Sequence, residues 1–360
     1  MYRIVHAGTG LTGREALAAI VDDPALDLVG VWVATPAKVG LDAGQLCGRH
    51  PTGVVATADV EAIIALRPDC VCYCSTAVRR ERQAVSDIAR FLAAGIDVVA
   101  ISIIPMVYPP AARSDWRATI HDAAMKGQST FYATGSEPGA LSLNIPTALL
   151  TCAGRVDSYR MDEYALGLDE SYPIWEVLHE SMGFGKPDGH VPARIASGKV
   201  NDDWATVVRY VADILGLPID GIELDWETVL APDDISTAVG VISTGTICAH
   251  RWRLAGVIDG RPAVAVQYFA TLSTTPWPEA WPKPTRSDAH GVMVYRIEGR
   301  PRMSLELVLE PHDPQDGVNP GVCATAMAAV NAIPVVVNAG PGVIGQPLSG
   351  PAIVTRQSRQ

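Results

Sequence analysis

Six residues near the amino terminus have the types and spacing needed to hold a phosphate. Gly8, Gly10 and Gly13 form the pattern G-x-G-x-x-G, between an apolar segment, 3–7, and a helix-forming segment, 14–21. In a strand–turn–helix unit the first glycine makes a tight turn, the second lets the backbone approach a pyrophosphate, and the third lets the helix pack closely. The start of the helix also attracts anions. The pattern predicts a dinucleotide site rather than a glycine turn without ligand, made by Gly8, Thr9, Gly10, Leu11, Thr12 and Gly13.

The residues after the second predicted strand bear on which dinucleotide binds. An acidic residue about 20 positions after the glycine motif usually binds the ribose 2′-hydroxyl of NAD. Here residues 33–38 read VATPAK, and the first carboxylate after this segment is that of Asp42. Thr35 is suited to hydrogen-bond a 2′-phosphate and Lys38 to neutralise it. We therefore expect NADP, with NAD as the alternative cofactor if Lys38 is only a solvated loop lysine.

Three cysteines alternate along one predicted strand. Cys70, Cys72 and Cys74 share a face, which suits either a metal site or core packing. The paired C-x₂-C spacing of zinc sites is absent, and a strand buried on both faces favours small apolar side chains, so we expect core packing and no metal. Ligands of open α/β sheets bind beyond the carboxyl ends of the strands. This rule predicts a cofactor edge at Cys74, Ser75, Thr76, Ile101 and Ser102.

The elements that position these residues change in character near residue 150. Before it, short continuous apolar strands alternate with helical segments, which is typical of βαβ units in a buried parallel sheet. After it, longer strands follow one another, and Asp259-Gly260 predicts a tight hairpin. The predicted fold class is α/β. A doubly wound N-terminal Rossmann sheet (1–150, with a last helix at about 320–340 packing back on it) precedes a C-terminal α+β domain for substrate binding and dimerisation (151–320).

Composition excludes several classes of partner. The chain has 360 residues, of which 48% are hydrophobic and 19% charged, with a net charge of −11. This acidic balance argues against nucleic acid or an anionic membrane surface as a partner. Seven cysteines without a paired framework indicate a reducing, cytoplasmic compartment. The apolar stretch 98–107 is far shorter than the roughly 18 residues of a membrane span, and no targeting segment is visible.

Candidates for proton transfer lie close to the predicted domain boundary and beyond it. Hydride transfer to a carbonyl or imine needs a proton donor within reach. Glu137 lies at a predicted strand-to-helix turn, His179 follows an aromatic segment, and Tyr164 and Tyr172 are phenolic donors. Each has a structural alternative: Glu137 as a helix-capping carboxylate, His179 as a half-buried residue of an amphipathic segment.

Three further features leave a functional and a structural interpretation open. Residues 182–186 (MGFGK) suit a flexible loop over the substrate. His250, Arg251 and Arg253 suit either an anion site or a solvated strand face. Trp277 and Trp281, between prolines, suit a lid, a dimer contact or surface-loop packing.

Several segments in combination resemble a known group. These are the opening VHAGTGLTGREAL, residues 36–44 (PAKVGLDAG), 135–139 (GSEPG), 245–262 (GTICAHRWRLAGVIDGRP) and 331–334 (NAIP). They are similar to dihydrodipicolinate-reductase-like oxidoreductases, in the branch that includes 2,4-diaminopentanoate dehydrogenase and native amine dehydrogenases. The resemblance implies a Rossmann domain, an α+β substrate domain, NAD(P) as cofactor and a homodimer.

The chain departs from that branch where its catalytic carboxylate is expected. In amine dehydrogenases of this type a glutamate follows the fifth strand, a few residues before a Tyr-Pro-like pair. The corresponding residues 102–109 read SIIPMVYP, with Ile104 or Pro105 at the expected place. Neither side chain can transfer a proton. Glu137 is a second departure, because the family more often has a neutral residue in that turn, and the lysine-bearing diaminopimelate-recognition segment of a dihydrodipicolinate reductase is also missing.

From these residues and this resemblance we expect an NAD(P)H-dependent oxidoreductase. It would transfer hydride between the nicotinamide and a carbonyl, imine or activated double bond of a small, mostly apolar substrate. One alternative is an amine dehydrogenase or reductive aminase that uses a displaced carboxylate, Glu137. Another is an NADP-binding sensor without turnover.

Overall fold

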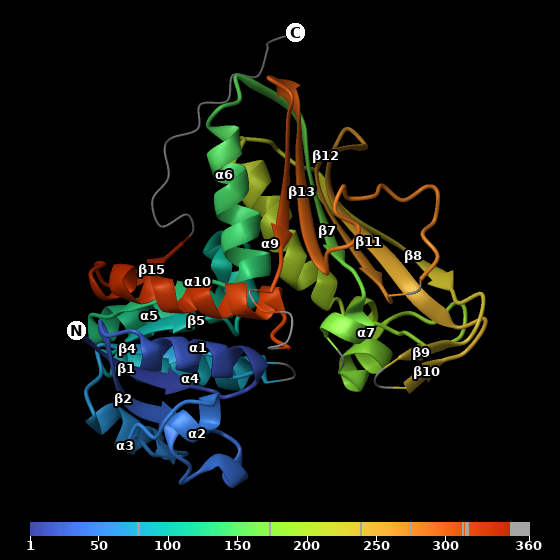
Figure 1. Ribbon diagram of the computed structural model, residues 1–360. Coiled ribbons are helices and arrows are strands. Elements are labelled where there is room, and N and C mark those ends of the chain that lie inside the picture. The colour runs from blue at the N-terminus through green and yellow to red at the C-terminus, as the bar shows by residue number, and fades with distance from the viewer. Residues whose placement is uncertain are drawn as a thin grey trace. The chain divides into compact units, whose positions relative to one another are not determined.

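The protein divides into two compact units (Figure 1). Within the described residues, one comprises 1–144 with 322–345, and the other comprises 145–321. The computed structural model describes residues 1–77, 80–172, 174–237, 240–273, 275–311, 313 and 317–345.

The first unit contains a seven-stranded sheet in the order β15-β6-β5-β4-β1-β2-β3. All of its strand pairs are parallel, which confirms the predicted Rossmann architecture. Every residue of β4 and β6 is buried, as expected for strands covered on both faces. The strands are β1 Tyr2–Ala7, β2 Leu26–Trp32, β3 Ala56–Thr57, β4 Cys70–Tyr73, β5 Asp97–Ala100, β6 Thr130–Ala133 and β15 Gly342–Ile344.

Two helices of this unit begin where an aspartate accepts hydrogen bonds from their free N–H groups. The Asp42 carboxylate accepts from the Gly44 N–H at the start of α2, and Asp59 accepts from Glu61 and Ala62 at the start of α3. The helices are α1 Leu11–Asp22, α2 Ala43–Cys47, α3 Val60–Ala65, α4 Glu81–Ala93, α5 Ser114–Gly127 and α10 Pro320–Val337. Short helical turns lie at Pro36–Lys38, Ile104–Val107, Pro109–Ala111 and Ser136–Asn144.

Helix α10 is the one helix in the described part of the chain that is long and apolar enough to span a membrane, judged by length and composition alone. The helix itself was predicted at about 320–340, but its length and apolar character exceed those of the stretch 98–107. Its Ala329 and Ile333 are completely buried in a core cluster with Ile4 of β1 and Ala16 of α1. Together α1 and α10 cover one face of the parallel sheet, so α10 has the packing of a core helix.

The second unit contains a six-stranded sheet in the order β14-β13-β7-β12-β11-β8. Strands β7 and β12 are parallel, and the other neighbours in this sheet are antiparallel. The expected α+β organisation is therefore confirmed. The strands are β7 Arg155–Ala165, β8 Gly221–Leu230, β11 Ile247–Ile258, β12 Arg261–Thr271, β13 Gly291–Arg300 and β14 Met303–Leu309, with a separate pair β9 Ile235–Thr237 and β10 Gly240–Ile242.

The predicted hairpin joins β11 to β12. Ile258 pairs with Arg261, and Asp259 and Gly260 both have positive φ, 49° and 71°. Two positive φ values are what a two-residue turn between twisted antiparallel strands requires.

One face of this sheet is covered by α9, whose residues contact β11 and β12. The Thr147 and Tyr210 hydroxyls lie 2.5 Å apart and link α6 to α9. The helices of the unit are α6 Ile145–Leu150, α7 Leu168–Ser171, α8 Ala193–Ala196 and α9 Lys199–Ile214, with an irregular turn at Glu176–Ser181.

Candidate functional site

The glycine loop between β1 and α1 has the geometry that a dinucleotide requires. A Cβ added to Gly8, whose φ is 92°, would lie 2.4 Å from the backbone nitrogen of Ser75. A Cβ on Gly13 would lie 2.0 Å from the carbonyl oxygen of Gly8. A Cβ on Gly10 would meet no atom within 4 Å, so this position faces open space. Gly8 and Gly13 thus permit close packing within the protein, and Gly10 leaves room for a pyrophosphate.

The first turn of α1 is suited to an anion. No side chain caps Gly10, the residue before the helix, and the first turn holds no acidic residue. The first N–H groups of a helix have no partner within it and carry its positive dipole end. Leu11, Thr12 and Gly13 supply these groups, so the residues present fit the phosphates of a nicotinamide dinucleotide.

Lys38 lies against this loop. Its Nζ donates to the carbonyl oxygen of Thr9 at 2.7 Å and lies 3.0 Å from the Thr9 hydroxyl. Thr35 is exposed and immediately precedes the short turn that carries Lys38. The first carboxylate after β2, Asp42, is occupied by the N–H groups of Gly44 and Gly53 at 2.7 and 2.8 Å. In the described residues at this position, the Lys38 ammonium lies beside the glycine loop, and the carboxylate of Asp42 is already hydrogen-bonded elsewhere.

The structure brings the predicted strand-end residues together. The Cys74 N–H donates to Ala7 at the end of β1, and Ile101 donates to Tyr73 at the end of β4. The Ser102 hydroxyl donates to the carbonyl oxygen of Ser75. Thr76 follows Ser75 directly. These residues and the glycine loop thus share the carboxyl edge of the parallel sheet.

The alternating cysteines have a neighbour that sequence reasoning missed. The parallel register pairs His6 of β1 with Cys72 of β4, and the potential ligand atoms of His6, Cys72 and Cys74 lie within 4.8 Å of one another. All three side chains are buried, and hydrogen bonds from Cys74 and His6 lower the pKa of Cys72 to about 6. Cys70, Cys72 and Cys74 belong to the core cluster under α10, and all seven cysteines are free thiols. That this group holds no metal stays a prediction.

Glu137 follows β6 at the same edge of the sheet. Its φ of −148° is extended, so it lies in an irregular turn rather than in a regular helical one. Both carboxylate oxygens are buried. The preceding Ser136 is fixed to α10, because its hydroxyl lies 2.6 Å from that of Thr325. The segment 104–107 after β5 forms a turn whose Pro105, Met106 and Val107 are buried.

His179 and the 182–186 segment are firmly held in the second unit. The His179 ring stacks on Trp175 with centroids 4.5 Å apart, and its Nδ1 lies 2.7 Å from the carbonyl oxygen of Phe184. Phe184 is completely buried, and the Gly185 N–H donates to Ile247 of β11. The segment expected to be a flexible loop is therefore part of the packed structure.

Tyr164 lies on one face of the six-stranded sheet in an aromatic cluster. It stacks on Phe269 with ring centroids 4.7 Å apart, and Trp277 and Trp281 complete the cluster. Trp281 is 4% exposed, so these tryptophans pack on the sheet and form no open lid. Burial raises the pKa of Tyr164.

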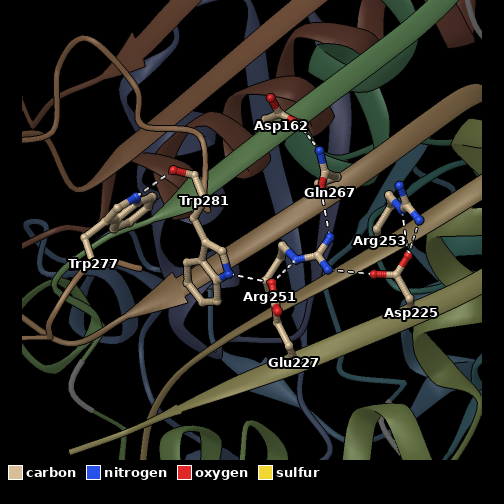
Figure 2. A network of polar contacts seen from close by, with 8 residues as sticks. All are labelled: Asp162, Asp225, Glu227, Arg251, Arg253, Gln267, Trp277 and Trp281. Carbon is tan, nitrogen blue, oxygen red and sulfur yellow. Dashed lines mark hydrogen bonds and ion pairs between the residues drawn. The ribbon is translucent and has the colours of Figure 1, made fainter. Parts of the chain in front are cut away.

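The same face carries a network of ion pairs (Figure 2). Arg251 pairs with Asp225 and with Glu227, both at 2.7 Å, and Arg253 pairs with Asp225 at 2.6 Å. Gln267 connects Arg251 to the completely buried Asp162, which also pairs with Arg296. These arginines already have carboxylate partners, and neither an anion site nor a simply solvated strand face describes them.

His250 was expected beside those arginines but lies on the other face. It is 0% exposed, which corrects the expectation of a solvated residue. Strand alternation explains the difference, because successive side chains point to opposite faces. Burial raises the pKa of Tyr172, and the nearby charge of Arg194 lowers it by a smaller amount, whereas Tyr164 packs against Phe269. The structure therefore separates Tyr164 from Tyr172.

Comparisons with known proteins agree with these features. No family model matches the chain. It is 31% identical to an amine dehydrogenase of Streptomyces virginiae over 349 residues, which cover 95% of this chain and 94% of the relative. A segment of 63 residues, 18% of this chain and 23% of the relative, is 33% identical to a 4-hydroxy-tetrahydrodipicolinate reductase of Synechocystis.

Two solved structures share the fold. An amine dehydrogenase from Mycobacterium smegmatis has a TM-score of 0.72 at 19% identity, covering 99% of this chain and 97% of that one. A Synechocystis biliverdin reductase solved with biliverdin and NADP+ has a TM-score of 0.50 at 12% identity, covering 94% and 90%. With the glycine loop and the full-length sequence match, the chain belongs to the amine dehydrogenase family of dihydrodipicolinate-reductase-like, NAD(P)-dependent oxidoreductases.

Proposed function

We propose that this protein interconverts a small, mostly apolar primary amine and the corresponding carbonyl compound with NADP(H). In the oxidative direction a primary ammonium, NADP+ and water give a carbonyl compound, ammonium, NADPH and one proton. The bound nicotinamide exchanges the hydride. The full-length match to an amine dehydrogenase carries this proposal, supported by the open glycine loop at Gly10.

The preference for NADP rests on the loop that follows β2. Lys38 lies against Thr9, and the first carboxylate, Asp42, is committed to backbone N–H groups. A fixed cation without a competing carboxylate favours a 2′-phosphate over a 2′-hydroxyl. Gly8 to Gly13 would hold the pyrophosphate, and Cys74, Ser75, Thr76, Ile101 and Ser102 would line the carboxyl edge of the sheet.

Glu137 is the carboxylate of the first unit that we assign to proton transfer. It follows β6 at the carboxyl edge, next to strand β5, whose own following segment 102–109 contains no carboxylate. His179, Tyr172 and Tyr164 remain candidates from the second unit, of which Tyr164 has the aromatic surroundings of a packing residue. We place the protein in the cytoplasm and expect a homodimer.

A second function has its own support. Because residues 102–109 hold no carboxylate, reduction of a carbonyl or an activated double bond without nitrogen chemistry is the alternative reaction. A sensor that binds NADP without turnover is the alternative outside catalysis.

The test uses purified protein, NADPH and a panel of ketones, aldehydes and enones, with and without ammonium. Absorbance measures NADPH loss, and mass spectrometry identifies the product. Amine formation that requires ammonium supports the proposal. Alcohol or saturated product without ammonium selects the second function, and tight NADPH binding without turnover selects the sensor. Glu137→Gln should reduce turnover, whereas Glu176→Gln, an exposed control, should not.

A further inference from the structure

A buried polar cluster lies on the face of the six-stranded sheet opposite the ion-pair network of Figure 2. The register pairs Glu163 of β7 with Tyr268 of β12, and Tyr268 with Trp252 of β11, so the three side chains form a row across one face. His250 is two residues from Trp252 on the same strand and therefore shares this face. Its ring centroid lies 6.1 Å from that of Tyr268.

Two helices and one loop contribute further members of this cluster. The Arg194 guanidinium of α8 lies 5.5 Å from the ring centroid of Trp204 and 5.6 Å from that of Tyr268. Trp204 of α9 packs edge-on against Trp252 at 5.1 Å. The ring centroids of Phe184 and His250 lie 5.6 Å apart. The charged group is thus enclosed by aromatic rings.

Several buried polar atoms of the cluster have no hydrogen-bond partner among the residues that the structure describes. His250 and Trp252 are both 0% exposed. A buried polar group without a partner loses its hydration without compensation, and native proteins hold few such groups. Their concentration here indicates a place that a polar ligand completes. The atoms are Glu163 Oε2, Arg194 Nε and Nη1, His250 Nδ1 and Nε2, and Trp252 Nε1.

The chemistry of these atoms selects the ligand. The Arg194 and tryptophan nitrogens can only donate hydrogen bonds. His250 is a neutral ring with one donor and one acceptor, because burial and the Arg194 charge lower its pKa to about 3. Burial raises the pKa of Glu163 to about 7, against the smaller lowering effects of Arg194 and Trp204, so Glu163 takes up a proton readily near neutrality. Excess donors and a fixed cation suit a carboxylate, and the aromatic walls suit an apolar body.

We propose that the cluster of Glu163, Arg194, His250 and Tyr268 binds the carboxylate group of a small molecule with an apolar or aromatic body. Assigning that carboxylate to the substrate rests on the proposed function, whereas the binding site itself does not. Arg194 supplies the charge, and Glu163 binds in its protonated form. Trp204 and Trp252 report on occupancy because their indoles belong to the cluster.

The binding test uses the full-length protein without cofactor and follows tryptophan fluorescence. The probes are phenylacetate, its amide phenylacetamide and 2-phenylethylamine. Phenylacetate should bind at least about tenfold more tightly than the other two, and Arg194→Met should remove this preference. Arg209→Met changes an exposed arginine of α9 and should leave it intact. Equal affinity for acid and amide, or an Arg194→Met protein that still prefers the acid, overturns the proposal.

Folding of Arg194→Met is checked by circular dichroism. If that variant does not fold, Arg194→Lys replaces it, because lysine keeps the charge but loses the planar set of N–H donors. This variant should lose at least about fivefold in phenylacetate affinity, and an unchanged affinity contradicts the site.

Proton uptake provides a test that a purely structural cluster would not pass. Glu163, Tyr268, Tyr172 and His250 all interact with the Arg194 charge, and of these four groups Glu163 has its pKa between about 6 and 8. Calorimetry at about pH 8 in two buffers of different ionisation enthalpy should show that phenylacetate binding takes up close to one proton. Glu163→Gln should abolish the uptake. No uptake by the wild type contradicts the role of Glu163.

Turnover distinguishes this inference from the proposed function. The matched substrates are 4-oxo-4-phenylbutanoate and butyrophenone, with ammonium and NADPH. Arg194→Met should raise KM for the acid at least about tenfold and leave KM for the neutral ketone unchanged. Phenylacetate binding without any turnover contradicts the proposed function and supports the carboxylate site. Turnover in which Arg194→Met has no effect on the acid removes the inference and keeps the function.

Discussion

The two units build their candidate sites from different materials. In the first unit, backbone N–H groups and the space left by Gly10 make the site, and one short segment of chain supplies them. In the second unit, side chains from β7, α8, α9, β11 and β12 converge on one face of a sheet. A site of the first kind is formed by consecutive residues and can be recognised in the sequence. A site of the second kind exists only after strand register and helix packing are set.

The largest effect should follow from filling the space at Gly10. In Gly10→Ala the new Cβ meets no protein atom, so the fold is kept, but the methyl group occupies the space assigned to the pyrophosphate. We expect NADPH affinity to fall about 100-fold, measured by quenching of protein fluorescence. Gly340→Ala, also at an open glycine of this unit, is the matched control. Equal NADPH affinity in both variants would contradict the assignment of the open space at Gly10 to the pyrophosphate.

A second prediction concerns the sheet face opposite the polar cluster. Arg296→Met removes one of the arginines paired with the completely buried Asp162 and leaves Arg160 at 3.1 Å. We expect the free energy of unfolding to fall by about 2 kcal/mol, measured in urea. Arg302→Met breaks an exposed pair with Glu298 and should change the free energy by less than about 0.5 kcal/mol. Similar losses in both variants would show that side-chain register matters less in this unit than we infer.

The cofactor preference gives a smaller effect in the first unit. The double variant Thr35→Ala/Lys38→Ala removes the hydroxyl and the cation assigned to the 2′-phosphate. NADPH affinity should fall about tenfold, while NADH affinity stays within about twofold. An equal loss for both cofactors would show instead that Lys38 only supports the backbone of Thr9.

The smallest effect is a pH dependence in the second unit. The folded state raises the pKa of Glu163 from 4.5 to about 7, so between these values it binds more protons than the unfolded state. This group therefore favours folding in mildly acidic solution, and its contribution is lost as the pH rises through about 7. Glu163→Gln should raise Tm by a few degrees at about pH 8 and have little effect at about pH 5. A Tm difference that does not vary with pH would contradict the burial of the ionised carboxylate.

Local patterns predicted the elements well because each element signals its own presence. The segment 14–21 became part of α1, and the Asp259-Gly260 pair became the turn between β11 and β12. Residues 78–94 also predict a long helix; α4 begins at Glu81, and residues 78 and 79 lie outside the described residues. The glycine pattern was interpretable for the same reason, since its turn geometry depends on adjacent residues.

The buried clusters could not be predicted from local sequence patterns. His6 meets Cys72 only because β1 and β4 pair in one particular register. Glu163 was overlooked in favour of its neighbour Tyr164, and a shift of one residue exchanges the two faces of a strand. Arg194 belongs to a helix of four residues, too short to show any periodicity. An alternation count along β7 could have separated Glu163 from Tyr164, but it could not have supplied their partners.

The connections between the strands of the second sheet also have a kinetic consequence. Strands β11 and β12 are joined by two residues, whereas Asp162 of β7 meets Gln267 of β12 across 105 residues of chain. Closing the short loop costs much less entropy, so we expect the hairpin carrying His250, Trp252 and Tyr268 to form before β7 docks. Glu163 consequently leaves water late in folding, and in alkaline solution it must do so as an ion. We therefore expect ionisation of Glu163 above neutral pH to speed the unfolding of this unit more than it slows refolding.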